Sequence, residues 1–334
     1  MKLKKLAVAS AILFGTTLAG SAWSQNCMKG PATVGFLPKM DTDPYFQVAR
    51  DGAMEAQKEL GGKFIQQAPS TATPDAQIEF LNALVAQKVD VLAISSTDAN
   101  ALKPALKRAA AQGVRVISYD SDVTKDARMI FVNQAKSDSL ALQMLESMGK
   151  LIDFNGEFAV LSSTPTATNQ NAWIDLMKKQ IASNPKFAKM KLVQVAYGEE
   201  SEQVNQQQAL ALAEAFPNLK GIIVPAGIGL PAAARALEQS GALKKIKLTG
   251  LAPASFMRKY IEAGVAEDIW WNVTDLGYLT YYVAQALAQC KITGKPGETF
   301  DVGRLGKYTV GADGEVVLGA AKIVTPKNLT EFQF

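Results

Sequence analysis

Short runs of Val, Ile and Leu alternate with longer amphipathic segments along most of the chain. Gly, Pro, Asp or Ser bound most of these runs, and their length is typical of buried strands in a parallel sheet. The segments between them have the apolar spacing of helices that cover such a sheet. We expect strands at residues 33–37, 63–67, 89–95, 115–119, 129–132, 157–162, 191–196, 221–224, 247–251 and 268–271.

The intervening segments also carry helix-start signals. Pro74-Asp75 and Thr97-Asp98 supply turn and capping groups, and Pro231 fits a first helical turn. Strands and helices alternate with few exceptions, which predicts an α/β fold whose parallel sheets are covered on both faces. We expect helices at residues 75–87, 101–112, 137–152, 171–183, 202–215, 231–240, 254–263 and 276–288.

The chain is too long for a single hydrophobic core, because 334 residues exceed what one core usually organises. Residues 31–133 and 134–251 form two similar α/β units. We assign residues 252–296 to the first lobe and residues 297–334 to the second. Two similar lobes joined by several crossings predict a hinged cleft that receives ligand groups from both sides.

The first residues are typical of an export signal. Residues 1–24 hold an early lysine cluster, an apolar stretch and small residues before Ser24, where we expect cleavage. Export favours pairing of the two cysteines, Cys27 and Cys290. Cys27 precedes the first strand, and Cys290 follows an apolar helix that runs back to the same edge, so we expect a disulfide. The alternative is two free thiols, one buried and one in a frayed terminus.

Composition makes several classes of function less favourable. The net charge is only +4 and the chain shows no basic patch interleaved with aromatic residues, so no nucleic-acid partner is expected. The chain contains no histidine, which removes the commonest general base and metal ligand. We expect neither a metal nor a cofactor, and no enzymatic activity.

Two enzymatic alternatives still deserve consideration. Residues 227–232 formally match the G-x-G-x-x-A pattern of dinucleotide binding, but the next strand ends without the acid that would hold a ribose. Asp120 and Asp122 lack the opposed geometry of glycosidase carboxylates. A dehydrogenase and a hydrolase are therefore the disfavoured alternatives. A sugar-responsive repressor is disfavoured because the leader stands where a helix-turn-helix would be.

Polar and aromatic residues follow many of the expected strands, where the loops of an open parallel sheet meet a ligand. Asp120 is the candidate acceptor for adjacent hydroxyl groups, and Trp271 and Phe46 are candidates for stacking on a sugar ring. Loops after strands are polar in any α/β protein, and Trp173 or Trp270 fits an ordinary core position equally well. The predicted ligand-binding residues are Lys39, Phe46, Asp120, Asn169, Gln170, Pro225, Gly227, Trp271 and Asn272.

Six motifs are informative in combination: FLPK at 36–39, PALKRAAAQGV at 104–114, YDSD at 119–122, STPTATNQNAW at 163–173, IIVPAGIGLPAAARA at 222–236 and IWWNVTDLGY at 269–278. Together they resemble the rhamnose-binding and autoinducer-2-binding branch of the ribose-type periplasmic binding proteins of ABC importers. The resemblance covers nearly the whole chain after the leader and implies a type I periplasmic binding protein fold. In that fold, two Rossmann-like lobes with parallel sheets are joined by a three-crossover hinge.

The resemblance also implies a function and site residues. Autoinducer-2 receptors use residues that match Lys39, Asp120, Asn169-Gln170, Pro225 and Gly227, although Asn169 replaces their aspartate. The rhamnose-like motifs favour a small neutral carbohydrate, with autoinducer-2 as the alternative. The implied protein is a monomer in the periplasm that delivers its ligand to an inner-membrane ABC permease.

Overall fold

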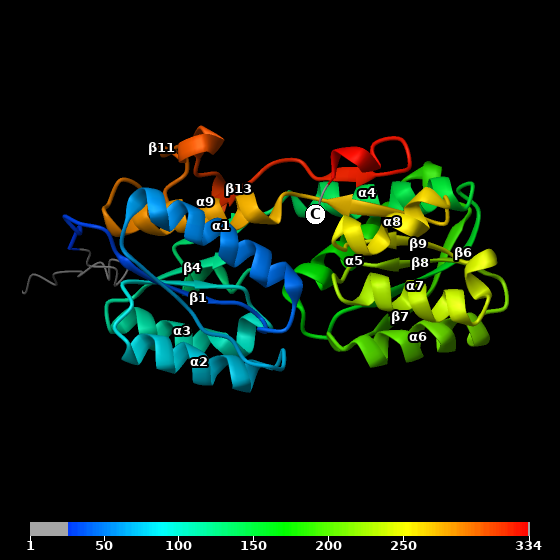
Figure 1. Cartoon of the computed structure of the whole chain (residues 1–334), viewed down its shortest axis with the longest axis horizontal. Coiled ribbons are helices and arrows are strands. Elements are labelled where there is room, and N and C mark those ends of the chain that lie inside the picture. The colour runs from blue at the N-terminus through cyan, green and yellow to red at the C-terminus, as the bar shows by residue number, and fades with distance from the viewer. Residues whose placement is uncertain (1–25, 333–334) are drawn as a thin grey trace, which may run out of the picture.

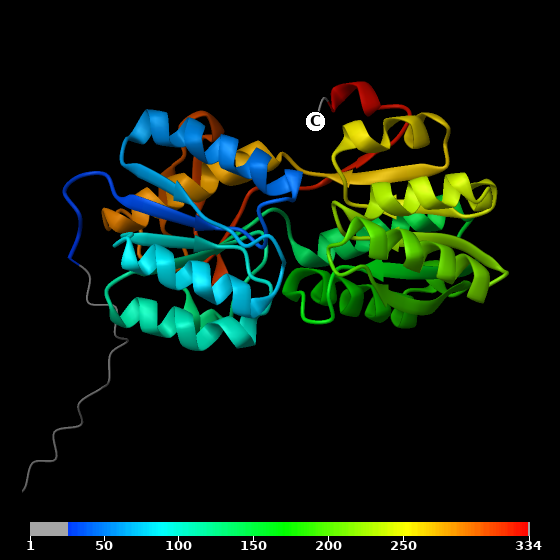
Figure 2. The same ribbon diagram turned by 60° about the horizontal axis from the view of Figure 1, so that its bottom comes forward.

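The computed structural model describes residues 26–332 and shows two α/β lobes side by side (Figure 1). The predicted signal peptide, residues 1–24, lies outside the described residues. In both views each lobe has a central sheet with helices on its two faces (Figures 1 and 2). The alternation of strands and helices expected from the sequence is therefore confirmed.

The first lobe contains a six-stranded parallel sheet in the order β13-β5-β4-β3-β1-β2. Helices α1 and α9 lie on one face, and α2 and α3 lie together on the other (Figure 1). The strands are β1 (Thr33–Leu37), β2 (Lys63–Gln66), β3 (Val91–Ile94), β4 (Arg115–Tyr119), β5 (Ile130–Asn133) and β13 (Glu315–Val317), and the helices are α1 (Pro44–Leu60), α2 (Pro74–Ala86), α3 (Ala99–Ala111) and α9 (Val273–Ala288). A small hairpin of β11 (Thr299–Asp301) and β12 (Lys307–Thr309) adds to this lobe.

The second lobe repeats the plan with the order β14-β10-β9-β8-β6-β7, in which only β14 runs antiparallel to its neighbour. The strands are β6 (Gly156–Ser162), β7 (Met190–Tyr197), β8 (Leu219–Val224), β9 (Lys247–Gly250), β10 (Ala266–Trp270) and β14 (Lys322–Val324), and the helices are α4 (Ser137–Leu151), α5 (Thr168–Ser183), α6 (Glu202–Ala215), α7 (Gly229–Gln239) and α8 (Ala254–Glu262). Short 3₁₀ turns occur at Lys125–Ala127, Pro185–Phe187, Ala242–Lys244, Gly303–Leu305, Ala312–Gly314 and Leu329–Glu331.

The chain crosses between the lobes three times, as expected. The crossings lie between β5 and α4, between β10 and α9, and between β13 and β14. The predicted assignment of residues 252–296 to the first lobe is wrong for their first part, because β10 pairs with β9 and β14 of the second sheet. Conversely, β13 of the predicted second-lobe tail pairs with β5 of the first. Both lobes share one strand-helix pattern, so the pattern alone does not reveal which sheet a strand joins.

Two glycines bring α1 and α9 into direct backbone contact. A Cβ atom at Gly52 would lie 1.8 Å from the carbonyl oxygen of Thr274, and one at Gly277 would lie 1.7 Å from that of Ala49. Glycine is required at both positions because no other residue permits this approach. Helix α9 begins at a lobe crossing, so this contact fixes the first lobe's end of the hinge.

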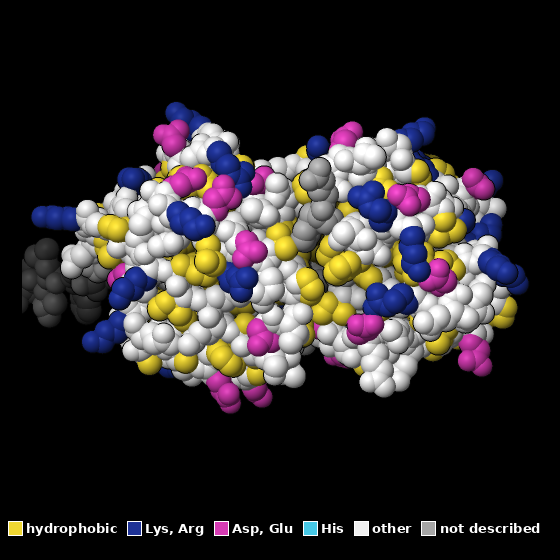
Figure 3. All heavy atoms as spheres, viewed as in Figure 1, with side chains coloured by type: hydrophobic (Ala, Val, Ile, Leu, Met, Phe, Trp, Pro, Cys, Tyr) yellow, Lys and Arg dark blue, Asp and Glu magenta, His cyan; other side chains and the backbone are white. Residues whose placement is uncertain are grey.

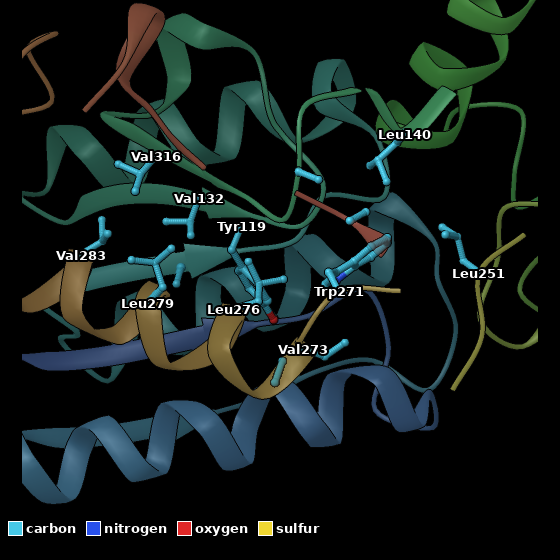
Figure 4. Close-up of a cluster of buried hydrophobic side chains, with 14 of the residues drawn as sticks. Tyr119, Val132, Leu140, Leu251, Trp271, Val273, Leu276, Leu279, Val283 and Val316 are labelled. Carbon is cyan, nitrogen blue, oxygen red and sulfur yellow. The ribbon is translucent and has the colours of Figure 1, made fainter. Parts of the chain in front are cut away.

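The core of the first lobe lies between α9 and the sheet. Leu276, Leu279 and Val283 of α9 point toward Tyr119 and Val132 of the strands, and all five side chains are buried (Figure 4). The all-apolar strands predicted this burial. The contact attaches the hinge helix α9 to the strand that precedes Asp120.

A disulfide joins Cys27 to Cys290, as predicted. Next to it, the backbone N–H of Met28 donates to the carbonyl oxygen of Ala288 at 3.0 Å. The bridge fastens the segment before β1 to the end of α9, 263 residues away in sequence. It therefore closes a loop that contains almost the whole protein.

We predict that replacing both cysteines, Cys27→Ser with Cys290→Ser, lowers the free energy of unfolding by about 2–5 kcal/mol, because the unfolded chain is no longer constrained. Urea unfolding followed by tryptophan fluorescence measures this change. A reductant should destabilise the native protein equally and leave the double variant unaffected. Equal unfolding midpoints for the two proteins would contradict a stabilising bridge.

Candidate functional site

A cavity lies between the lobes, at the carboxyl ends of strands from both sheets. It contains about 620 Å³ of empty space, part of it open to solvent. The position agrees with the rule that ligands of open parallel sheets bind beyond the carboxyl ends of the strands. Its lining residues are Lys39, Asp43, Tyr45, Phe46, Asp120, Asn169, Gln170, Trp173, Glu200, Pro225, Gly227, Leu251, Ala252, Pro253, Ile269, Trp270, Trp271 and Val273.

The Asp120 carboxylate, directly after β4, is the centre of a hydrogen-bond network. The Tyr45 hydroxyl donates to its Oδ1 at 3.0 Å, and the Ser95 hydroxyl donates to its Oδ2 at 2.7 Å. The indole N–H of Trp271 donates to the Tyr45 oxygen at 3.2 Å. Burial, followed by the charge of Asp120, raises the pKa of Tyr45 well above its usual value, so the phenol keeps its proton and donates.

The backbone at Asp120 has the left-handed conformation, with φ of 59°. Aspartate and asparagine adopt this region more readily than most other residues that have a side chain. The tight turn after β4 therefore directs a carboxylate into the cavity, whereas a continued strand would direct it to one face of the sheet. Only 5% of Asp120 is exposed.

Lys39 and Asn169 connect the two lobes across the cavity. Lys39 follows β1, Asn169 lies in the first turn of α5, and the Lys39 ammonium donates to the Asn169 oxygen at 3.2 Å. Asn169 also accepts from the backbone N–H of Gln170 at 3.1 Å. The Gln170 side-chain oxygen is buried and has no hydrogen-bond partner among the described residues. This oxygen is free to accept from a ligand.

Aromatic rings form one wall of the cavity. The Tyr45 ring meets Phe46 edge-on, with centroids 5.1 Å apart, and it meets Trp271 edge-on at 6.2 Å. Trp173 and Trp270 line the cavity as well, although Trp173 is almost fully buried. The site therefore combines flat apolar surfaces with a few fixed polar groups.

Eight of the nine predicted ligand-binding residues line this cavity: Lys39, Phe46, Asp120, Asn169, Gln170, Pro225, Gly227 and Trp271. Asn272 is the exception. It caps α9, because its side-chain oxygen accepts from the backbone N–H of Asp275 at 3.0 Å. The sequence contains a helix-capping signal at this position, because an asparagine is followed three residues later by an acid.

Glu200 is a cavity residue that the sequence analysis missed. It lies between β7 and α6, and both Glu199 and Glu200 have the left-handed backbone conformation. The buried Asn205 side chain holds this loop, donating to the carbonyl oxygens of Gly198 at 3.1 Å and Ser201 at 2.9 Å. A search of every loop that follows a strand would have found Glu200, since the residue follows β7.

Asp43 faces Glu200 across the cleft. Its carboxylate caps α1 by accepting from the backbone N–H of Tyr45 at 2.9 Å. Burial, followed by the charge of Glu200, raises the pKa of Asp43 to about 7, with Asp120 acting in the same direction and Lys39 and the Tyr45 N–H against it. Asp43 of the first lobe is therefore an acid that titrates near neutral pH, and it faces Glu200 of the second lobe.

The described residues contain no group of three candidate metal ligands. In residues 26–332 no helix has the length and apolar character needed to cross a membrane. The polar groups of the cavity suit a solute that donates and accepts hydrogen bonds.

Residues 34–294 match the family model for a periplasmic binding protein domain, so the chain belongs to that family. The chain is 36% identical to an ABC transporter solute binding protein from Clostridium phytofermentas solved with bound L-rhamnose. That match has a TM-score of 0.87 and covers 90% of this chain and 98% of the other. The periplasmic binding proteins are components of transport systems, and this chain is a binding protein and not an enzyme.

Two further relatives are more distant. The chain resembles LsrB from Clostridium saccharobutylicum in complex with AI-2, with 24% identity, a TM-score of 0.84 and coverage of 90% of this chain and 100% of that one, which shows a common fold. It is 28% identical over 123 residues to the ABC transporter periplasmic-binding protein YphF of Escherichia coli, a match that spans 36% of this chain and 37% of YphF.

We predict that the raised pKa of Asp43 makes the protein less stable as pH rises from about 4 to about 7. In this window the folded state holds a proton that the unfolded state releases, so each step up in pH favours unfolding. Asp43→Asn keeps a good helix cap and removes this penalty. The melting temperature of the variant minus that of the native protein should therefore increase as pH rises from about 4 to about 7.

Asp98→Asn is the matched control, because Asp98 caps α3 through the same kind of hydrogen bond outside the cavity. It corrects for the exchange of a capping carboxylate for an amide. A melting-temperature difference between Asp43→Asn and native protein that is the same at pH 5 and pH 8 would contradict the prediction.

Proposed function

We propose that the protein captures a 6-deoxyhexose of the L-rhamnose type in the cavity between its lobes and delivers it to an ABC importer. The observation that carries this proposal is the Asp120 carboxylate, held by two neutral hydroxyl donors beside the Trp271 ring. Sugar hydroxyls donate to such a carboxylate, while the C–H face of the ring packs on an aromatic surface. The relative with bound L-rhamnose supports the choice of sugar.

The remaining wall favours a sugar with an apolar edge. Pro225, Leu251, Ala252, Ile269 and Val273 line the cavity. A methyl group in place of the C6 hydroxymethyl group leaves fewer polar atoms to satisfy at such a wall. The proposed ligand-binding residues are therefore the eight predicted residues that line the cavity, together with Tyr45.

Binding would act through closure of the lobes. The first lobe supplies Lys39 and Asp120, the second supplies Asn169 and Gln170, and Trp271 lies at a crossing between them. A ligand that contacts both sets binds the closed form better than the open form, and this difference in affinity shifts the equilibrium. We propose that the closed monomer then presents the sugar to an inner-membrane permease, after export that depends on residues 1–24.

The second candidate ligand is autoinducer-2. The observation in its favour is that Lys39, Asp120, Gln170, Pro225 and Gly227, the residues named from the autoinducer-2 receptors, do line one cavity. Against it, Asn169 presents an amide where those receptors have a carboxylate. Heat-treated purified protein should release activity in a luminescence reporter assay if autoinducer-2 is bound, and none if the ligand is a sugar.

A thermal-shift screen with pentoses, hexoses, deoxy-sugars and polyols tests the proposal, since a ligand that binds only the native state raises the melting temperature. Calorimetry then gives the affinity of each positive compound. We expect L-rhamnose to give the largest shift. A screen in which deoxyhexoses have no effect would refute the proposed ligand class.

We predict that Asp120→Asn weakens sugar binding about 10- to 100-fold, because the amide keeps the turn but has one acceptor oxygen in place of two and loses the charge that strengthens bonds from hydroxyls. Calorimetry measures the affinity.

Asp122→Asn is the matched control. Asp122 pairs with Arg128 at 2.7 Å and lines no part of the cavity, so this change should lower the free energy of unfolding by about 1–3 kcal/mol and leave affinity unchanged. Equal affinity for Asp120→Asn and native protein would remove Asp120 from the site.

A further inference from the structure

A second cavity adjoins the first at the mouth of the cleft. The two share Asp43, Glu200, Gly227 and Pro253 in their walls, so they are immediate neighbours. The outer cavity contains about 950 Å³ of empty space, partly open to solvent. Residues near α1 form one side and residues of α7 and α8 form the other, so it too lies between the lobes. A group attached to an inner ligand would extend outward at the residues that both cavities share.

Apolar side chains from both lobes contribute to the wall of this outer cavity. Met40 and Pro44 contribute from the first lobe, and Ile228, Pro231 and Phe256 contribute from the second. Phe256 is 53% exposed, and it has the largest exposure among the large hydrophobic side chains of the described residues. Hydrophobic side chains gather at the waist between the lobes, where α1, α7 and α8 begin (Figures 1 and 3). Exposed apolar clusters of this kind mark binding surfaces.

Gly227 lies where the two cavities meet and adds no side chain there. Its φ is not positive, and a Cβ atom at this position would meet nothing within 4 Å. Neither backbone conformation nor local packing therefore requires glycine here. The absence of a side chain at Gly227 leaves open space at a point that both cavities share.

Charges at this junction disfavour an anionic occupant. Asp43 and Glu200 repel an anion, and the Arg235 guanidinium at the rim is already paired with Glu202 at 2.5 Å. An apolar group gains contact with the exposed Phe256 ring and the neighbouring aliphatic side chains without leaving a polar atom unpaired.

We propose that the outer cavity binds the apolar aglycone of a glycoside whose sugar ring occupies the inner cavity. This inference rests on the proposed function, because the sugar ring must first occupy the inner site. It extends the ligand class from free deoxyhexoses to their aryl or alkyl glycosides. Phe256 is the specificity-determining residue of the outer site, and it touches only the aglycone.

Calorimetry with three compounds tests this proposal: L-rhamnose, methyl α-L-rhamnopyranoside and 4-nitrophenyl α-L-rhamnopyranoside. The native protein should bind the nitrophenyl glycoside at least about fivefold more tightly than the methyl glycoside, which is what one aromatic contact contributes. Phe256→Ala should reduce this ratio below about twofold, with L-rhamnose affinity unchanged, and Phe256→Leu should give an intermediate ratio.

Leu210→Ala is the matched control, because Leu210 is another exposed hydrophobic residue of the second lobe and lies outside both cavities. Its ratio should equal the native one. Binding of L-rhamnose without a gain for the nitrophenyl glycoside, or a gain that survives in Phe256→Ala, overturns the aglycone site alone. Absence of binding for all three compounds overturns the proposed function as well.

Discussion

The burial of one carboxylate between two lobes is the constraint on which the binding site depends. Asp120 receives hydrogen bonds from two neutral hydroxyls, those of Tyr45 and Ser95, while the ammonium of Lys39 donates across the cleft to Asn169. A buried charge is costly unless donors surround it. A ligand with several hydroxyl groups supplies such donors when the lobes enclose it. The same need is met by the neutral carbohydrate that we propose as the ligand.

Tyr45 connects this carboxylate to the hinge. Its hydroxyl donates to Asp120 and accepts from Trp271, which lies between β10 of the second lobe and α9 of the first. Helix α9 is in turn fixed to α1 by the backbone contact at Gly52 and Gly277. The same side chains would therefore contact a ligand in the cavity and lie at one crossing between the lobes.

The two lobes contribute different chemistry to the cleft. The first lobe provides Asp120, Lys39 and the titrating Asp43, all near the beginning of α1 or the ends of its strands. The second lobe provides amides and an apolar wall that continues outward to Phe256. This division explains how one cleft can hold the polar ring of a sugar at its centre and an apolar substituent at its mouth.

The strands, the helices and most of the site could be predicted from the sequence, because hydrophobic periodicity defines the elements and parallel strands place the residues that follow them at one edge. Asp120, Lys39 and Trp271 were found in this way. The lobe to which β10 and β13 belong could not be predicted, since both sheets use the same local pattern and only hydrogen-bond pairing distinguishes them. Asn272 caps a helix, and Glu200 enters the cavity through a left-handed turn. These outcomes depend on where the backbone directs a side chain, which tertiary packing decides.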